Sequence, residues 1–206
     1  MFPRRLQPVL DRWVEGKLTV REFLMQAEWE KVWNFPPELY LPLFEFARIN
    51  RIPMVALNVE RSLTKAIGEK GWDNVPAADR AGLSRPAPAL PAYRELLSSV
   101  YREHLPGPRR VPGKPAPTDK AFEAFVDAQL TWDRAMAENL ASRAVPGKAG
   151  SKPLLVGIMG SGHLRHGHGV AHQLRALGFN QIATLLPRSG DMFCNDLEPG
   201  LADAVF

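Results

Sequence analysis

The pattern of apolar and polar positions along the chain predicts a succession of helices joined by irregular connections. In several segments apolar residues recur every three or four positions, which is the period of an amphipathic helix. Thr19 and Glu22 form a capping box that marks the start of one of these helices. The helices predicted in this way cover residues 8–15, 19–33, 42–50, 62–70, 92–104, 119–144 and 170–177.

Three short apolar runs predict buried strands between these helices. They are residues 52–57 (IPMVAL), 154–159 (LLVGIM) and 181–186 (QIATLL). A continuous apolar run of this length is typical of a parallel strand that is covered on both faces. We therefore predict a helix-rich α/β fold, with a mostly parallel sheet and flanking helices, in a single domain that spans residues 1–206.

Composition and charge narrow the functional classes. Of the 206 residues, 45% are hydrophobic and 23% are charged, as in ordinary globular proteins. The net charge is +4, but the basic residues form no stripe interleaved with aromatic residues, so no nucleic-acid partner is predicted. No apolar run approaches the ~18 residues of a transmembrane helix. The single cysteine, Cys194, excludes an internal disulfide, and residues 105–118 have the composition of a linker.

The predicted helix 119–144 carries polar residues within its apolar face. At about 100° per residue, that face consists of Phe122, Val126, Leu130, Met136, Ala137 and Leu140, and the opposite face of Glu123, Asp127, Arg134 and Glu138. Gln129 and Asp133 fall near the centre of the apolar face, and Trp132 at its edge. A buried carboxylate needs a partner. Asp133 is therefore expected either to pair with an arginine or cap a backbone, or to orient a histidine or arginine of a functional site.

A stretch rich in glycine and histidine follows the second predicted strand. Gly160-Ser-Gly-His163, with His166, His168 and His172 after it, holds four of the chain's five histidines. In an open α/β fold, the loop after a strand lies at the edge of the sheet where ligands bind. His163 is a candidate ligand or general acid/base, and the alternative is a loop histidine bonded to the backbone. The glycine spacing fits neither a dinucleotide fingerprint nor a P-loop.

Stretches from one end of the chain to the other resemble a known family. They are Met1-Phe-Pro-Arg, Gln7-Pro-x-Leu-Asp-x-Trp13, Tyr40-x-Pro-Leu-Phe44 with Phe46-Ala-Arg48, Ile52-Pro-Met-Val-Ala-Leu-Asn58, Gln129-x-x-Trp-Asp133 with Met136-Ala137, and Gly160-Ser-Gly-His163 with Gly167-x-Gly169. In order and spacing they resemble the ChaN family of haem-binding, iron-regulated uptake proteins. That family belongs to a wider superfamily with the Tiki proteases, TraB and the erythromycin esterases.

The resemblance implies haem as cofactor and partner. It makes Tyr40 the leading phenolate ligand of the iron and His163 a second candidate axial ligand. Arg48 is expected to stabilise the phenolate or to pair with a propionate. The further candidate cofactor-binding residues are Asn58, Trp132 and Asp133. The alternatives are a half-buried Tyr40 bonded to the backbone, a structural ion pair for Arg48 and a turn-forming role for Asn58.

The resemblance also implies two opening strands, the first with a Gly-Glu-x-His-Asp motif, which the printed sequence does not contain. We therefore expect a sheet that is incomplete at the N-terminus, from a late start assignment or a fragment. Haem binding in iron acquisition, storage or transfer is the predicted function. A metal-dependent hydrolase of the Tiki or esterase type, or a non-catalytic interaction domain, is the alternative. A cell-envelope location, a homodimer, and membrane association through an upstream segment remain open expectations.

Overall fold

The structure is a computed structural model that describes residues 2–104, 119–144, 153–187 and 197–206. The predicted linker 105–118 and Cys194 lie outside the described residues. The chain divides into two compact units, Met1–Glu60 and Arg61–Phe206, and each unit is described by itself. Of the helices in the described ranges, none combines the length and the apolar character that a membrane span requires.

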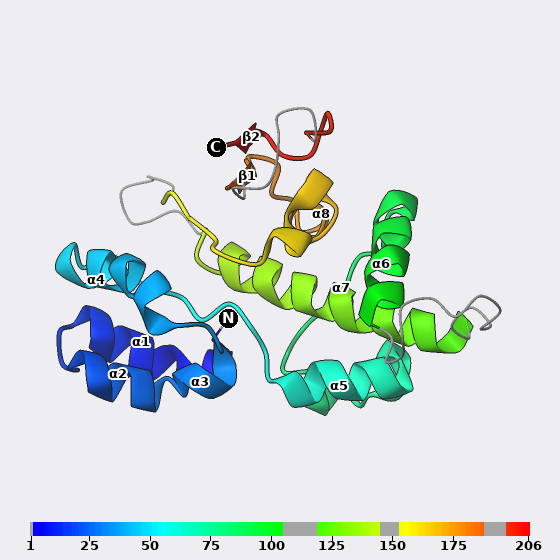
Figure 1. The fold of residues 1–206 in the computed structure, drawn as a ribbon. Helices are drawn as coiled ribbons and strands as arrows, with labels where there is room; N and C mark the ends of the chain where they lie inside the picture. Colours follow the sequence, from blue (N-terminus) through cyan, green and yellow to red (C-terminus); the bar gives the residue numbers. More distant parts are fainter. Residues whose placement is uncertain (1, 105–118, 145–152, 188–196) are drawn as a thin grey trace. The chain divides into compact units, whose positions relative to one another are not determined.

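The first unit is a set of short helices around an aromatic core (Figure 1). Its helices are α1 Gln7–Val14, α2 Val20–Gln26, α3 Trp29–Val32 and α4 Leu41–Ile49, with 3₁₀ turns at Arg4–Leu6 and Pro37–Leu39. The rings of Trp13 and Phe23 lie 4.5 Å apart between centroids, in the range of favourable aromatic pairs. Trp13 also donates its Nε1–H to the carbonyl of Phe44 at 2.9 Å, which joins α1 to α4.

The helix predicted over 19–33 is two helices, and the prediction of one continuous helix is wrong. The break is at Glu28, whose φ of 50° is left-handed. This turn changes the direction of the chain between α2 and α3, so that Phe23 and Trp29 both enter the core. Burial of two large aromatic side chains outweighs the modest cost of one left-handed residue. The apolar period continues across the break, so the pattern alone does not reveal it.

The capping box at the start of α2 is present, which gives a direct test of local stability. The Thr19 hydroxyl accepts the backbone N–H of Glu22, and the Glu22 carboxylate accepts the backbone N–H of Thr19. We expect Thr19→Ala to lower the free energy of unfolding by about 1 kcal/mol, because the N–H of Glu22 loses its acceptor and the Glu22 carboxylate loses the hydroxyl that holds it in place. Urea denaturation measures the change. Thr19→Ser keeps the hydroxyl and should remain near wild type; equal losses in the two variants would contradict a capping role.

The second unit is organised around the long helix α7, Asp119–Ala141. Helices α5 Arg61–Lys70, α6 Pro91–His104 and α8 Val170–Ala176 all pack against it (Figure 1). Short 3₁₀ turns lie at Trp72–Asn74, Ala77–Asp79, Ser161–His163 and Arg165–Gly167. Because α7 is covered from several sides, its buried surface is wider than the predicted apolar face. Arg134, predicted on the polar side, is buried and bonded to Glu138 and Ser84.

The helix-rich character is confirmed, but the mostly parallel sheet is not. Among the described residues the sheet consists of two short parallel strands, β1 Leu185–Leu186 and β2 Ala204–Val205. The strand predicted over 181–186 is therefore present only at its end. Residues 154–159 form no strand, and Leu154, Val156 and Ile158 are 91%, 76% and 50% exposed. A strand requires a partner for its N–H and C=O groups, and the described residues offer none to this run.

Residues 52–57 also form no strand, because other groups take their backbone hydrogen bonds. The Gln7 side chain donates to the carbonyl of Met54 and accepts the N–H of Ala56, each at 2.8 Å. A single parallel bridge pairs Asn58 with Pro3. The amide side chain of Gln7 thus takes the place of a neighbouring strand. The hydrophobic pattern of the sequence does not predict such a contact.

Candidate functional site

The centre of the candidate site is the carboxylate of Asp133 in the interior of the second unit. Asp133 is 0% exposed and Tyr93, which faces it from α6, is 1% exposed. The Tyr93 hydroxyl donates to Asp133 Oδ2 at 2.8 Å, and His163 Nδ1 lies 2.7 Å from Asp133 Oδ1. Each carboxylate oxygen therefore has its own donor, which offsets the cost of burying the charge.

These hydrogen bonds define the protonation of the groups around Asp133. A carboxylate only accepts hydrogen bonds, so the proton of a neutral His163 ring is on Nδ1 and the lone pair is on Nε2. Nε2 makes no hydrogen bond to any other described residue. Burial, and then the charge of Asp133, raise the pKa of Tyr93 above its ordinary value, so its hydroxyl stays a donor. The arrangement leaves one ring nitrogen of His163 available to a ligand.

Two tight turns and a glycine bring His163 to Asp133. The 3₁₀ turns Ser161–His163 and Arg165–Gly167 are separated only by Leu164, and His166 inside the second turn has a left-handed φ of 55°. Gly169, at the start of α8, lies so close that an added Cβ would be 2.5 Å from the His163 carbonyl oxygen and 2.9 Å from Asp133 Oδ1. The glycine is therefore required for α8 and the His163 turn to approach the carboxylate together.

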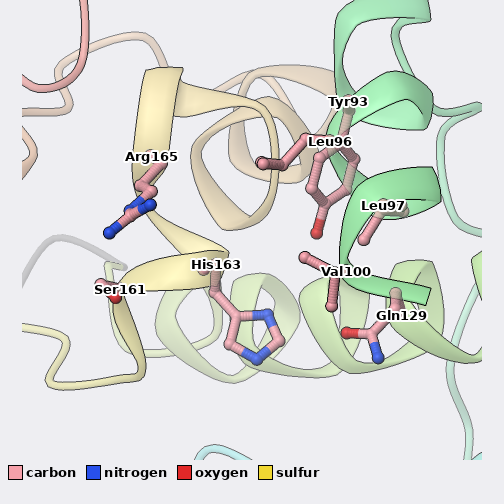
Figure 2. A pocket seen from close by; sticks show the side chains of 9 residues that line it. Tyr93, Leu96, Leu97, Val100, Gln129, Ser161, His163 and Arg165 are labelled. Atoms are coloured by element: carbon pink, nitrogen blue, oxygen red, sulfur yellow. The ribbon is translucent and has the colours of Figure 1, made fainter. Parts of the chain in front are cut away.

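His163 lines a cavity of about 290 Å³ between α6, α7 and the turn at 161–165 (Figure 2). Its apolar wall is formed by Leu96, Leu97 and Val100 of α6. Ser161 and Arg165 lie on the opposite side, and Gln129 of α7 is at the base. Gln129 and Asp133 are one helical turn apart, as predicted from their place on the helix face. The cavity thus has an apolar side, a polar side and an imidazole between them.

Two buried N–H groups beside the site lack partners among the described residues. They are Nε of Arg165 and Nε1 of Trp132. The Trp132 ring lies edge-on to His163, with centroids 6.3 Å apart. Buried donors without acceptors are uncommon in folded proteins. Arg165 is one of the residues that line the cavity, so it brings a cationic side chain to this site.

The remaining predicted site residues lie in the first unit. Tyr40 is half-buried among aromatic rings, with its centroid 5.2 Å from that of Trp33, and its hydroxyl makes no hydrogen bond to another described residue. The Arg48 guanidinium lies 4.7 Å from the centroid of Trp13 and 3.9 Å from the Glu45 carboxylate. Within this unit Arg48 therefore contacts Trp13 and Glu45 rather than Tyr40.

Asn58 makes local hydrogen bonds with its side chain and its backbone. Its side-chain oxygen accepts the N–H of Val59 at 2.9 Å, and its backbone pairs with Phe2 and Arg4. These bonds use the side-chain oxygen and both backbone groups of Asn58. A part in lining a cofactor site stays a prediction.

The other histidines of the loop do not join His163. The rings of His166 and His168 stack at 5.3 Å, and burial, with smaller contributions from His166 and His172, lowers the pKa of His168. His172 Nε2 lies 2.9 Å from the carbonyl of Pro88. Within the described ranges, no group of three or more His, Cys, Asp or Glu side chains is arranged to hold a metal ion.

Comparison with known proteins agrees with the resemblance predicted from the motifs. The family described as haem-binding uptake, Tiki superfamily, ChaN, matches residues 1–174. The chain belongs to this family. The matched range includes Tyr40 in the first unit and Tyr93, Asp133 and His163 in the second. No curated protein and no solved structure matches the chain significantly.

Proposed function

We propose that this chain binds haem and that Nε2 of His163 supplies an axial ligand to the iron. The observation that carries the proposal is the 2.7 Å contact between His163 Nδ1 and the buried Asp133, because it leaves the lone pair on Nε2 of a ring that lines a cavity. Metal-ligating histidines usually donate their other N–H to a carboxylate or carbonyl, which fixes the ring and raises its basicity. Histidine is one of the common axial ligands of haem iron.

The chemistry of the cavity fits a flat amphiphilic macrocycle. Leu96, Leu97 and Val100 offer apolar contact to the ring system. Arg165, with its buried Nε unpaired among the described residues, offers a cation to a propionate carboxylate on the other side. A volume of about 290 Å³ is at the lower end for small-molecule pockets, roughly 300–1,000 Å³. A cavity of this volume would enclose only part of a haem macrocycle.

Partial enclosure supports a role in holding and passing on haem during iron acquisition. A site that reacts on its haem is normally built to control access of small molecules to the iron. This cavity covers only part of the ligand, so the exposed part remains available to a donor or acceptor of haem. The description of the family as haem-binding uptake agrees with a role in taking up haem.

Hemin titration of the Asp133→Asn variant tests the proposal. The amide keeps the size of the side chain but removes the charge that makes His163 a strong donor. We expect hemin affinity to fall by roughly 10–100-fold, as for other lost partners of metal-bound histidines. The Soret absorbance of the full chain, followed against hemin concentration, measures the change.

Asp127→Asn is the matched control for this titration. Asp127 lies on the same helix and is partly buried, and among the described residues its carboxylate accepts only the N–H of Trp72, at 3.3 Å. It should bind hemin like wild type. A wild-type chain that leaves the Soret band of hemin unshifted would overturn the proposed function. Tyr40→Phe in the same series tests the predicted phenolate ligand independently.

A further inference from the structure

The hydroxyl of Tyr93 has a role that the proposed ligand set does not use. It is buried on α6 and donates to the one oxygen of Asp133 that His163 does not contact. Among the described residues, the Asp133 carboxylate has no third hydrogen-bond partner. The charge of this carboxylate is therefore shared between two donors, the phenol and the imidazole.

We propose that Tyr93 is a positioning residue of the haem site, which sets the electron-donating strength of His163 by sharing the charge of Asp133. This inference rests on the proposed function. Hydrogen bonds in a low-dielectric interior polarise one another, so a change at one oxygen of the carboxylate is felt at the other. When Tyr93 donates, it takes part of the negative charge away from the Nδ1–H of His163. When Tyr93 does not donate, the Nδ1–H of His163 interacts with the whole negative charge of the carboxylate.

The position of Tyr93 allows the hydroxyl to be removed without loss of the surrounding packing. Its ring belongs to an apolar cluster with Leu97, Val126 and Leu130, between α6 and α7. Phenylalanine fills the same space and makes the same contacts. The substitution therefore isolates the hydrogen bond, although it leaves Asp133 Oδ2 without a donor and costs some stability.

The reduction potential of bound hemin reads out the donor strength of His163. With Tyr93→Phe, the hydrogen bond from His163 to Asp133 strengthens and Nε2 becomes a better donor to ferric iron. We expect the potential to shift to a more negative value. With Asp133→Asn the donor weakens, and we expect a shift in the opposite direction. If Tyr93 only supported the fold, Tyr93→Phe would leave the potential unchanged or shift it in the same direction as Asp133→Asn.

Tyr101→Phe is the control on the same helix. The ring of Tyr101 packs on Phe125 at 5.0 Å, and its hydroxyl makes no hydrogen bond to a described residue. The reduction potential of hemin bound to Tyr101→Phe should equal that of hemin bound to the wild-type chain. In the double variant Tyr93→Phe, Asp133→Asn, the effect of Tyr93→Phe should largely disappear, because the shared charge is absent. An unchanged or more positive potential in Tyr93→Phe, with hemin bound normally, would overturn the proposal.

A measurement without haem separates this inference from the proposed function. In the ligand-free protein, the proton NMR signal of His163 Nδ1–H reports the strength of its bond to Asp133. We expect this signal to move downfield in Tyr93→Phe and to stay in place in Tyr101→Phe. If hemin fails to bind but the signal moves, the haem proposal fails while the coupling of Tyr93 to His163 stands. If hemin binds and the signal does not move, the role of Tyr93 is refuted.

Discussion

Replacing His163 by alanine is expected to abolish the axial coordination of hemin at this site. The substitution removes the imidazole that lines the cavity. Loss of a hydrogen-bond partner of a metal-bound histidine alone already costs about 10–100-fold in affinity. We therefore expect affinity to fall by roughly 100-fold or more. The shifted Soret band should be lost, and free imidazole, which fits the space left by the ring, should restore it. Titrations with and without imidazole measure both effects.

His172→Ala is the matched control for the loss of a histidine. His172 is on α8, and its Nε2 contacts the Pro88 carbonyl rather than the cavity. We expect its titration to follow wild type. If His163→Ala kept the wild-type Soret band and Tyr40→Phe lost it, the iron would be held by a phenolate and not by the imidazole. The two single variants therefore separate the two predicted ligands.

The inner part of the candidate site follows from the helical period of one segment. A period of 3.6 residues places Gln129 and Asp133 on the same inward face of α7, where a carboxylate cannot stay unpaired. The structure shows the partner, His163, and so favours the alternative in which Asp133 orients a histidine. The two residues are 30 positions apart, and no local pattern encodes that distance. Periodicity identifies a group that needs a partner but does not identify the partner.

Tyr93 and Arg165 were not among the predicted site residues. A tyrosine in an amphipathic helix has the same pattern as any core aromatic, and its hydroxyl becomes informative only when it faces Asp133. Arg165 lies two positions after His163. This closeness in sequence is the only feature of the sequence that could have indicated Arg165 as a site residue. Both belong to the candidate site because α6 and the turn at 161–165 pack on α7. The local spacing of residues in the sequence does not predict such tertiary packing.

Two of the three strand predictions, 52–57 and 154–159, failed for a related reason, and the third is present only at Leu185–Leu186. Apolar runs indicate burial, but a strand exists only where another strand pairs with its backbone. Residues 52–57 are bonded by the side chain of Gln7, and 154–159 have no ladder among the described residues. The helices, which satisfy their own backbone groups, were predicted to within a few residues. The break at Glu28 is the main exception, because it depends on the core that forms around it.

Gly169→Ala is expected to have the largest effect on the site of any small substitution. The new methyl group would lie 2.5 Å from the His163 carbonyl oxygen and 2.9 Å from Asp133 Oδ1, closer than such atoms approach. Neither neighbour moves freely, because the first is backbone and the second is held by two hydrogen bonds. We expect a loss of about 1–3 kcal/mol in the free energy of unfolding, typical of overpacking. Urea denaturation measures the loss.

The same substitution should also separate His163 from Asp133. Relief of the clash requires α8 or the His163 turn to move away from α7, which lengthens the 2.7 Å contact and weakens the hold on the imidazole. Hemin affinity should therefore fall together with stability. Gly162→Ala is the control, since an added Cβ there meets no atom within 4 Å, and its stability should stay near wild type. If the two variants unfolded at the same urea concentration, the close approach of Gly169 to Asp133 would not be a constraint on this site.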